Sequence, residues 1–366
     1  MKSYRLLLSL FFVFNLLTFT GCENSAAKSQ QIAINSQSPA AAAQTDSPVT
    51  PVPAAASAAA TNSEPTPTPA AWMDDYKGLE IFDDERNEIA RCSSGSEARD
   101  NLNYFLQAMI SQVNVDLQTE LKISEAEAQD IIFNRNTRIF STMNQDMQEI
   151  MEKVITDTSY YPPEAAPGLQ AAMVIMDYHT SQVKALSGGR DKDYTGVNRA
   201  TDLLRQPGSS FQVLAGYAPA IDLGLLNADS TVVDEPFTVD GYQPQNWWGN
   251  SYKGDMTVRQ AVAQSANVIA VKVGVETGLD KCFDYIQKFH FTTIVNNENI
   301  NGQTFTDKTA AMLLGGLTYG VRLLELTAAY GAIADDGAYN APVFYTKICD
   351  NEGKDLLQSK PSSEQI

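Results

Sequence analysis

The sequence predicts an α+β fold in which an antiparallel sheet is combined with a helical subdomain. Two β-rich apolar runs, residues 171–177 and 182–186, are joined by residues 178–181 and predict a β-hairpin. Helical patterns and loops then alternate along the rest of the chain, including residues 258–275 and 310–335. Antiparallel strands followed by helices are typical of α+β domains.

Residues 73–160 are predicted to be a mostly helical region that precedes this fold. One apolar stripe recurs at three- and four-residue steps, in Leu102, Phe105, Met109, Val113 and Leu117. Ser124 with Glu127 predicts a capping box, and Asn144 predicts the start of a further helix. A proline-rich break at residues 161–168 follows, and it begins the second predicted region, residues 161–366.

Residues 1–21 have the pattern of an export signal. Lys2 and Arg5 precede an apolar run, residues 6–17, which is shorter than the roughly 20 residues of a membrane-spanning helix. Gly21 followed by Cys22 resembles the bacterial lipoprotein cleavage box, in which the cysteine is acylated. We therefore expect a lipoprotein anchored through Cys22 at the extracytoplasmic face of the cell membrane; the alternative is ordinary secretion with an incidental cysteine.

Residues 22–72 are predicted to be a disordered tether. Residues 25–71 are nearly all Ala, Ser, Thr, Gln, Asn and Pro, and they show no apolar periodicity. Burial in such a segment cannot offset the entropy lost on ordering, and its prolines favour an extended chain.

The overall charge argues against some classes of partner. The net charge is -18 and the isoelectric point is about 4.5, so nucleic acid and a polybasic contact with lipid headgroups are disfavoured. Beyond Cys22, the three cysteines are widely spaced and the two histidines are isolated. These residues predict neither a disulfide framework nor a metal site, and no organic cofactor is indicated.

The chemically informative stretch is residues 205–212, Arg-Gln-Pro-Gly-Ser-Ser-Phe-Gln. Pro207 and Gly208 predict a turn into a helix, so Ser209 is expected at the helix N-terminus among free backbone N–H groups. Taken by itself, this pattern is most simply a helix start with a capping serine.

Several ordered segments carry a more specific signal. They are residues 198–200 (Asn-Arg-Ala), residues 205–211, residues 257–271 with Ser265-Ala-Asn267, residues 315–321, residues 325–330 and Gly337. Over nearly all of residues 104–366 the sequence resembles the transpeptidase domain of class A penicillin-binding proteins. The resemblance implies a fold like that of penicillin-binding proteins and serine β-lactamases, incomplete at its C-terminus.

The resemblance also implies a chemistry. That family transfers acyl groups from peptidoglycan stem peptides ending in D-Ala-D-Ala through a serine, and β-lactams acylate the same serine. Its motifs place the nucleophile at Ser209, a proton-relaying hydroxyl at Ser265 and a substrate-binding amide at Asn267. The implied partners are stem peptides, β-lactams and, through the lipid, a membrane.

Two departures from the family pattern point to an inactive site. Gln212 stands where Ser-x-x-Lys has its lysine, and an amide has no useful basicity with which to activate Ser209. No Lys-Thr-Gly follows residues 350–357, which resemble a late hairpin of the family. In addition, the tether and the helical region stand where class A members have a glycosyltransferase domain, so we expect no glycan polymerisation.

Three hypotheses follow. The chain is an active D,D-transpeptidase or carboxypeptidase, which predicts acylation of Ser209. It is a non-catalytic lipoprotein that binds peptidoglycan or another envelope partner, which predicts binding without acylation. Alternatively, it is a truncated gene remnant, which predicts coding sequence for Lys-Thr-Gly beyond residue 366. Gln212 favours the second hypothesis, because truncation does not remove an upstream lysine.

Overall fold

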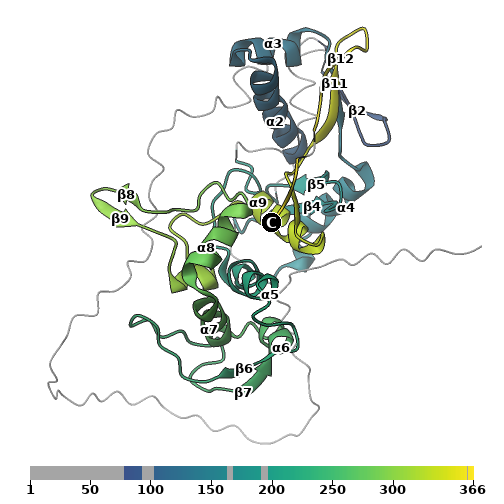
Figure 1. Ribbon diagram of the computed structural model, residues 1–366. Coiled ribbons are helices and arrows are strands. Elements are labelled where there is room, and N and C mark those ends of the chain that lie inside the picture. The colour runs from purple at the N-terminus through teal and green to yellow at the C-terminus, as the bar shows by residue number, and fades with distance from the viewer. Residues whose placement is uncertain (1–77, 93–102, 163–167, 191–196, 361) are drawn as a thin grey trace, which may run out of the picture. The chain divides into compact units, whose positions relative to one another are not determined.

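The computed structural model describes residues 78–92, 103–162, 168–190, 197–360 and 362–366 (Figure 1). The expected signal segment, Cys22 and the tether lie outside the described residues. The described segments all belong to one compact unit. Within them, no helix has both the length and the apolar character needed to cross a membrane.

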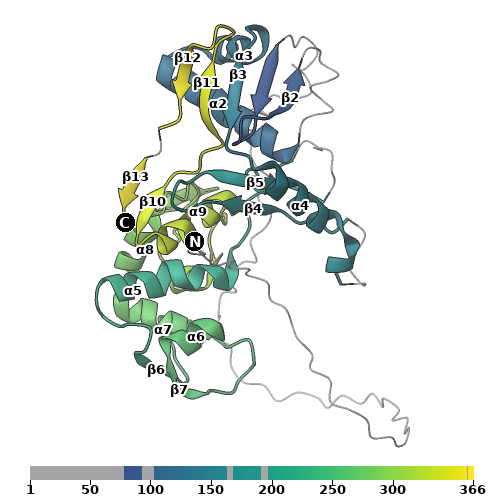
Figure 2. The ribbon, with the colours of Figure 1, turned by 90° about the vertical axis from the view of Figure 1, so that its right-hand side faces the viewer.

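A five-stranded sheet joins segments from opposite ends of the sequence (Figures 1 and 2). Its strand order is β12-β11-β3-β1-β2, and β1 is parallel to β3 while the other neighbours are antiparallel. The strands are β1 (Leu79–Phe82), β2 (Glu88–Cys92), β3 (Arg138–Ser141), β11 (Tyr345–Cys349) and β12 (Asp355–Gln358).

One row of apolar side chains crosses this sheet. Ile81 is opposite Ile139, Ile139 is opposite Ile348, and Ile348 is opposite Leu357. All four side chains are buried, because side chains at equivalent positions of paired strands share a face. The row lies in the same hydrophobic cluster as the helices that follow β2 in sequence.

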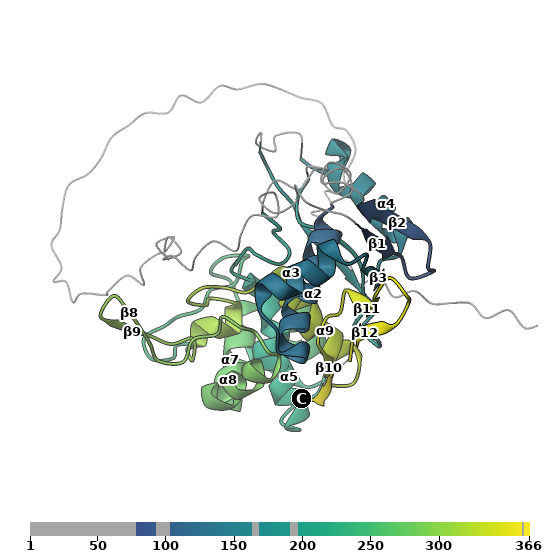
Figure 3. The same cartoon turned by 90° about the horizontal axis from the view of Figure 1, so that it is seen from above.

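Helices α2 (Tyr104–Leu121) and α3 (Glu125–Asn134) pack on this face and against each other (Figure 3). The predicted stripe is confirmed, since Phe105, Met109, Val113 and Leu117 are fully buried; Leu102 lies outside the described residues. The capping box at α3 is also confirmed: the Ser124 hydroxyl accepts from the Glu127 N–H, and the Glu127 carboxylate accepts from the Ser124 N–H.

The strands of residues 73–160 were not predicted. This region contains the expected helices, including α4 (Gln145–Thr156) with Asn144 as its N-cap, but β1, β2 and β3 interrupt it. Strand β3 pairs with β11, more than 200 residues along the chain. Strands from both sides of residue 161 therefore belong to one sheet, in which β11 and β12 extend the part formed by β1, β2 and β3.

The predicted hairpin is confirmed as β4 (Met173–Met176) and β5 (Val183–Ser187), an antiparallel two-stranded sheet. Helix α4 packs on β5 and α9 (Leu323–Ala334) packs on β4. Within the described part of the chain, no strand pairs with the other edge of β4, and all four of its residues are only half-buried.

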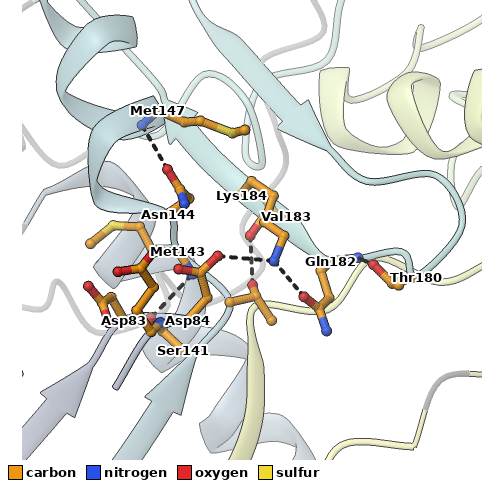
Figure 4. Close-up of polar contacts among 12 residues, drawn as sticks. Asp83, Asp84, Ser141, Met143, Asn144, Met147, Thr180, Gln182, Val183 and Lys184 are labelled. Atoms are coloured by element: carbon orange, nitrogen blue, oxygen red, sulfur yellow. Dashed lines mark hydrogen bonds and ion pairs between the residues drawn. The ribbon is translucent and has the colours of Figure 1, made fainter. Parts of the chain in front are cut away.

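Polar contacts join this hairpin to the five-stranded sheet (Figure 4). The Lys184 ammonium lies 3.3 Å from an Asp84 carboxylate oxygen and donates to the Gln182 side chain at 2.7 Å. The buried Thr142 hydroxyl donates to the carbonyl oxygen of Val183 at 2.6 Å. These bonds fix the hairpin relative to β3, because Thr142 directly follows that strand.

The helical subdomain is built on the segment that contains Ser209. A 3₁₀ turn, η4 (Gly208–Ser210), leads into a π-helical segment, η5 (Val213–Tyr217), and then into α5 (Ala218–Asp222). Around it lie α6 (Val258–Ala263), α7 (Asn267–Thr277), α8 (Leu279–Lys288) and η6 (Ala310–Leu314) (Figure 2). The remaining elements are η3 (Thr158–Tyr160), β6 (Thr231–Asp234), β7 (Gly254–Thr257), β8 (Glu298–Ile300), β9 (Gln303–Phe305), β10 (Ala338–Asn340) and β13 (Ser363–Gln365).

Candidate active site

Ser209 lies in the first turn of the helical segment, as the sequence predicts, and it is exposed to solvent. Gly208 before it has a φ of 58°, a conformation that glycine adopts without strain. Gly315 packs directly against this turn: a Cβ at Gly315 would lie 2.3 Å from the carbonyl oxygen of Gly208 and 2.4 Å from its nitrogen. The contact between two glycines therefore sets the position of the serine.

Contacts with neighbouring segments hold the two residues that follow Ser209. Phe211 is fully buried and its ring centroid lies 5.4 Å from that of Phe291. The Ser210 hydroxyl donates to the carbonyl oxygen of Pro207 at 2.7 Å, and the Tyr330 hydroxyl donates to the carbonyl oxygen of Ser210. Burial raises the pKa of Tyr330 to about 12, so this phenol stays protonated at neutral pH and cannot accept a serine proton.

Gln212 is 97% buried, with only 3% of its surface exposed. Its amide nitrogen donates to the side-chain oxygen of Asn267 at 2.9 Å. Among the described residues, no side chain is hydrogen-bonded to the Ser209 hydroxyl, that of Gln212 included.

Ser265 and Asn267 lie at the junction between α6 and α7. Ser265 is half-buried with a φ of 51°, in the left-handed region that few non-glycine residues adopt. Asn267 is the first residue of α7, and its amide nitrogen donates to the carbonyl oxygen of Gln245 at 2.9 Å. The structure thus joins Gln212 to Asn267 directly, while no side-chain hydrogen bond links Ser209 or Ser265 to either of them within the described residues.

A buried carboxylate supports this junction, and the sequence did not reveal it. Asp234 is 1% exposed; it accepts a bond from the Asn246 amide at 2.8 Å and another from the Lys253 N–H at 2.9 Å. Asn246 in turn accepts from the N–H of Val268 at 3.1 Å. The network fixes the first turn of α7 and so the side chain of Asn267. Its members are far apart in sequence, and no spacing in the sequence indicates that they meet.

A second contact holds the loop of residues 245–253 against Gln264, the residue before Ser265. The indole N–H of Trp247 donates to the carbonyl oxygen of Gln264 at 2.8 Å, while the ring itself is 70% exposed. The Lys253 ammonium lies 3.8 Å from the ring centroid of Trp248. The loop that carries Gln245 and Asn246 is therefore tied to Gln264, next to Ser265, by Trp247 and also by the Lys253 ammonium, which donates to the Gln264 side chain.

This geometry has defined chemical capacities. It exposes a serine hydroxyl at a helix start, where backbone dipoles favour developing negative charge. It also presents an asparagine whose position is set by three separate segments. Within the described residues, no histidine, lysine or carboxylate is hydrogen-bonded to the Ser209 hydroxyl.

Comparison with known proteins identifies the family. The family described as "Penicillin binding protein transpeptidase domain" matches residues 171–366, which is more than half of the chain. The chain belongs to the penicillin-binding protein transpeptidase family. Penicillin-binding protein 1A of Clostridium tetani is 33% identical over 305 residues, which cover 77% of this chain and 37% of that protein. Penicillin-binding protein 4 of Bacillus subtilis is 31% identical over 229 residues, covering 63% of this chain and 34% of the relative. The chain thus spans about a third of the length of these penicillin-binding proteins.

Solved penicillin-binding protein structures confirm the α+β transpeptidase fold. PonA1 of Mycobacterium tuberculosis aligns with a TM-score of 0.58 at 22% identity, covering 71% of this chain and 66% of that chain. Penicillin-binding protein 3 of the same organism, in complex with aztreonam, aligns with a TM-score of 0.61 at 16% identity, covering 80% and 71%.

Proposed function

We propose that this chain is a transpeptidase-type domain for peptidoglycan stem peptides in which acyl transfer is blocked at the proton-transfer step. Ser209 would be the acyl acceptor, Ser265 would relay a proton, and Asn267 would bind the peptide backbone. The observation that carries the proposal is the buried amide of Gln212, which donates to Asn267 and is not a base.

The proposed block follows from the proton balance of acylation. The Ser209 oxygen would bond to the penultimate D-alanine carbonyl carbon while the peptide bond to the terminal D-alanine breaks. The serine must lose a proton, and the departing amine must gain one. A lysine can accept the serine proton when its pKa is lowered by burial, whereas a glutamine amide cannot. Removing a general base typically slows such a step by about 10² to 10⁴-fold.

A second candidate function is binding without catalysis. The bond from Gln212 uses one lone pair of the Asn267 amide oxygen, and Asn267 remains only half-buried. A stem peptide ending in D-Ala-D-Ala could therefore be retained by the remaining groups. We further propose that Cys22 carries a lipid, which would hold the domain at the outer face of the membrane, next to its peptide partner. Nucleic acid is not a proposed partner.

The decisive experiment measures the intact mass of the full chain after incubation with benzylpenicillin. We expect no adduct on the wild-type chain, and we expect the Gln212→Lys variant to gain the mass of one penicillin on a peptide containing Ser209. Ser209→Ala in the Gln212→Lys background is the matched control and should remain unmodified. An adduct on wild-type Ser209 would refute the block. Equal inertness of the wild type and a folded Gln212→Lys variant would show that residue 212 is not what disables the site.

A further inference from the structure

The connection between β6 and β7 contains a segment of distinctive composition, residues 241–252, which we call the aromatic loop. Four of its twelve residues are aromatic, four are amides and none is charged. Nine of the twelve are exposed, so this composition is a property of the surface and not of the core. The aromatic residues are Tyr242, Trp247, Trp248 and Tyr252, and the amides are Gln243, Gln245, Asn246 and Asn250.

The two tryptophans of the aromatic loop are held in fixed positions. The Trp247 indole N–H donates to the carbonyl oxygen of Gln264 at 2.8 Å, and that of Trp248 donates to the carbonyl oxygen of Ser251 at 3.0 Å. The two rings meet edge to face, with their centroids 5.6 Å apart and their planes at 78°. Because each indole is bonded at its one polar atom, a ligand that stacks on these rings has little side-chain entropy to remove.

The two rings differ in what covers them. The Lys253 ammonium lies 3.8 Å from the ring centroid of Trp248, so a cation occupies one face of that ring. Trp247 is 70% exposed, and no other large hydrophobic side chain among the described residues is more exposed. A fixed aromatic ring that is open to solvent and flanked by amides suits a ligand with an apolar face and a polar edge.

We propose that the aromatic loop binds N-acetylated pyranose units of a glycan chain, with one sugar ring stacked on Trp247. The C–H groups on the face of a pyranose would meet the electron-rich face of the indole. Its hydroxyl and acetamido groups would bond to the amides of Gln243 and Asn250, which are both exposed and each provide donors and an acceptor.

The composition of the loop favours a glycan over other ligands. A charged ligand finds no ion-pair partner among residues 241–252. Protein interfaces are enriched in methionine and arginine as well as in aromatic residues, and the loop has neither methionine nor arginine. An uncharged sugar, in contrast, uses both of the groups that the loop supplies, ring faces and amides.

The aromatic loop adjoins the candidate active site. Gln264, which accepts the Trp247 N–H, directly precedes Ser265, and the Asn267 amide donates to the carbonyl oxygen of Gln245. A glycan stacked on Trp247 would therefore lie beside the residues proposed to hold a stem peptide. That this glycan is the peptidoglycan strand bearing the peptide rests on the proposed function, whereas the binding of the sugar itself does not.

Isothermal titration calorimetry of the full chain with chitotetraose, the tetramer of N-acetylglucosamine, tests the proposal. We expect binding with a Kd of about 0.1 to 1 mM, together with a change in tryptophan fluorescence. Cellotetraose has hydroxyls in place of the acetamido groups and should bind at least about threefold more weakly, because the bonds to the acetamido groups are lost.

Three variants separate the ring from its bond to Gln264. Trp247→Ala should weaken chitotetraose binding at least about tenfold. Trp247→Phe should stay within about threefold of the wild type, because it keeps an aromatic ring and loses only the N–H that bonds to Gln264. Tyr160→Ala is the control, since Tyr160 is an aromatic residue outside the loop that is 61% exposed, and binding should not change.

Several results would overturn the proposal. One is the absence of heat and of a fluorescence change up to about 10 mM chitotetraose. Another is unchanged binding in a Trp247→Ala variant whose circular dichroism matches the wild type. If Trp247→Phe binds as weakly as Trp247→Ala, the bond to Gln264 and not the ring determines binding. Equal affinity for cellotetraose would remove the role of the acetamido groups.

Sedimentation velocity tests the competing occupant, a second copy of this chain. We expect the wild type and Trp247→Ala to sediment alike. Self-association that Trp247→Ala abolishes would assign the loop to a contact between copies and would refute glycan binding. Chitotetraose carries no peptide for Ser209 to attack, so failure of this proposal and failure of the proposed function are separate results.

Discussion

Replacing Asn246 with alanine should destabilise the fold strongly, although a single small polar side chain is lost. The change removes the amide that donates to Asp234 at 2.8 Å and the oxygen that accepts from the Val268 N–H at 3.1 Å. Asp234 is 1% exposed and keeps one donor, the N–H of Lys253. Lost bonds to a charged group cost about 1.5 to 3 kcal/mol and an orphaned buried donor about 1 to 3 kcal/mol, so we expect a loss of about 3 to 5 kcal/mol in the free energy of unfolding.

Equilibrium urea unfolding, followed by tryptophan fluorescence, measures this loss. Asn299→Ala is the matched control, because Asn299 is exposed and its side chain accepts only the local N–H of Gly302; it should cost less than about 1 kcal/mol. In a cycle with Asp234→Ala, the double variant should be less destabilised than the sum of the single variants, by at least about 1 kcal/mol. A loss under about 0.5 kcal/mol for Asn246→Ala, or additivity in the cycle, would contradict the proposed network.

Two further changes test other contacts. Gly315→Ala should lower the free energy of unfolding by more than about 2 kcal/mol, because Gly315 has a φ of 74° and its new Cβ would collide with Gly208. The control is Gly353→Ala, which has a φ of 83° but no atom near its Cβ, and it should cost about 1 kcal/mol. Equal costs in urea unfolding would mean that the turn before Ser209 shifts to accommodate the new Cβ. Burial raises the pKa of Asp116, which accepts a bond from the Tyr345 hydroxyl, so this residue contributes stability at acid pH that is lost as pH rises through its folded-state pKa. Relative to the wild type, Asp116→Asn should therefore be more favourable at pH 7 than at pH 3.5, and a difference independent of pH would contradict this.

The sequence predicted the parts of this fold that depend on neighbouring residues. The α2 stripe, the Ser124–Glu127 capping box and the β4–β5 hairpin are set by contacts within one segment, and all three were confirmed. Strands β1 and β3 were missed because each has four residues, too few for alternation to stand out from a helical background. Their partner β11 comes more than 200 residues later, which no local pattern reveals.

For the candidate site, the sequence likewise located the residues but not the contacts between them. Family motifs located Ser209, Gln212, Ser265 and Asn267, and their catalytic roles remain proposals. The bond between Gln212 and Asn267 was not predicted, because the spacing of residues along a helix gives their common face but not which distant side chain meets them. Asp234 was missed for a similar reason: an aspartate at the end of a short strand looks like a turn residue until its burial is known.

The sheet that joins β3 to β11 also constrains when this protein can fold. During synthesis, strands β1 to β3 and helices α2 and α3 leave the ribosome first, and the partner of β3 follows only when residues 345–358 have been made. Closing so large a loop is slow, and until it closes β3 exposes an edge that can pair with other chains. Until residues 345–358 have been made, the β3 edge of the nascent chain therefore has no β11 to pair with, and this is the interval in which pairing with another chain competes with folding.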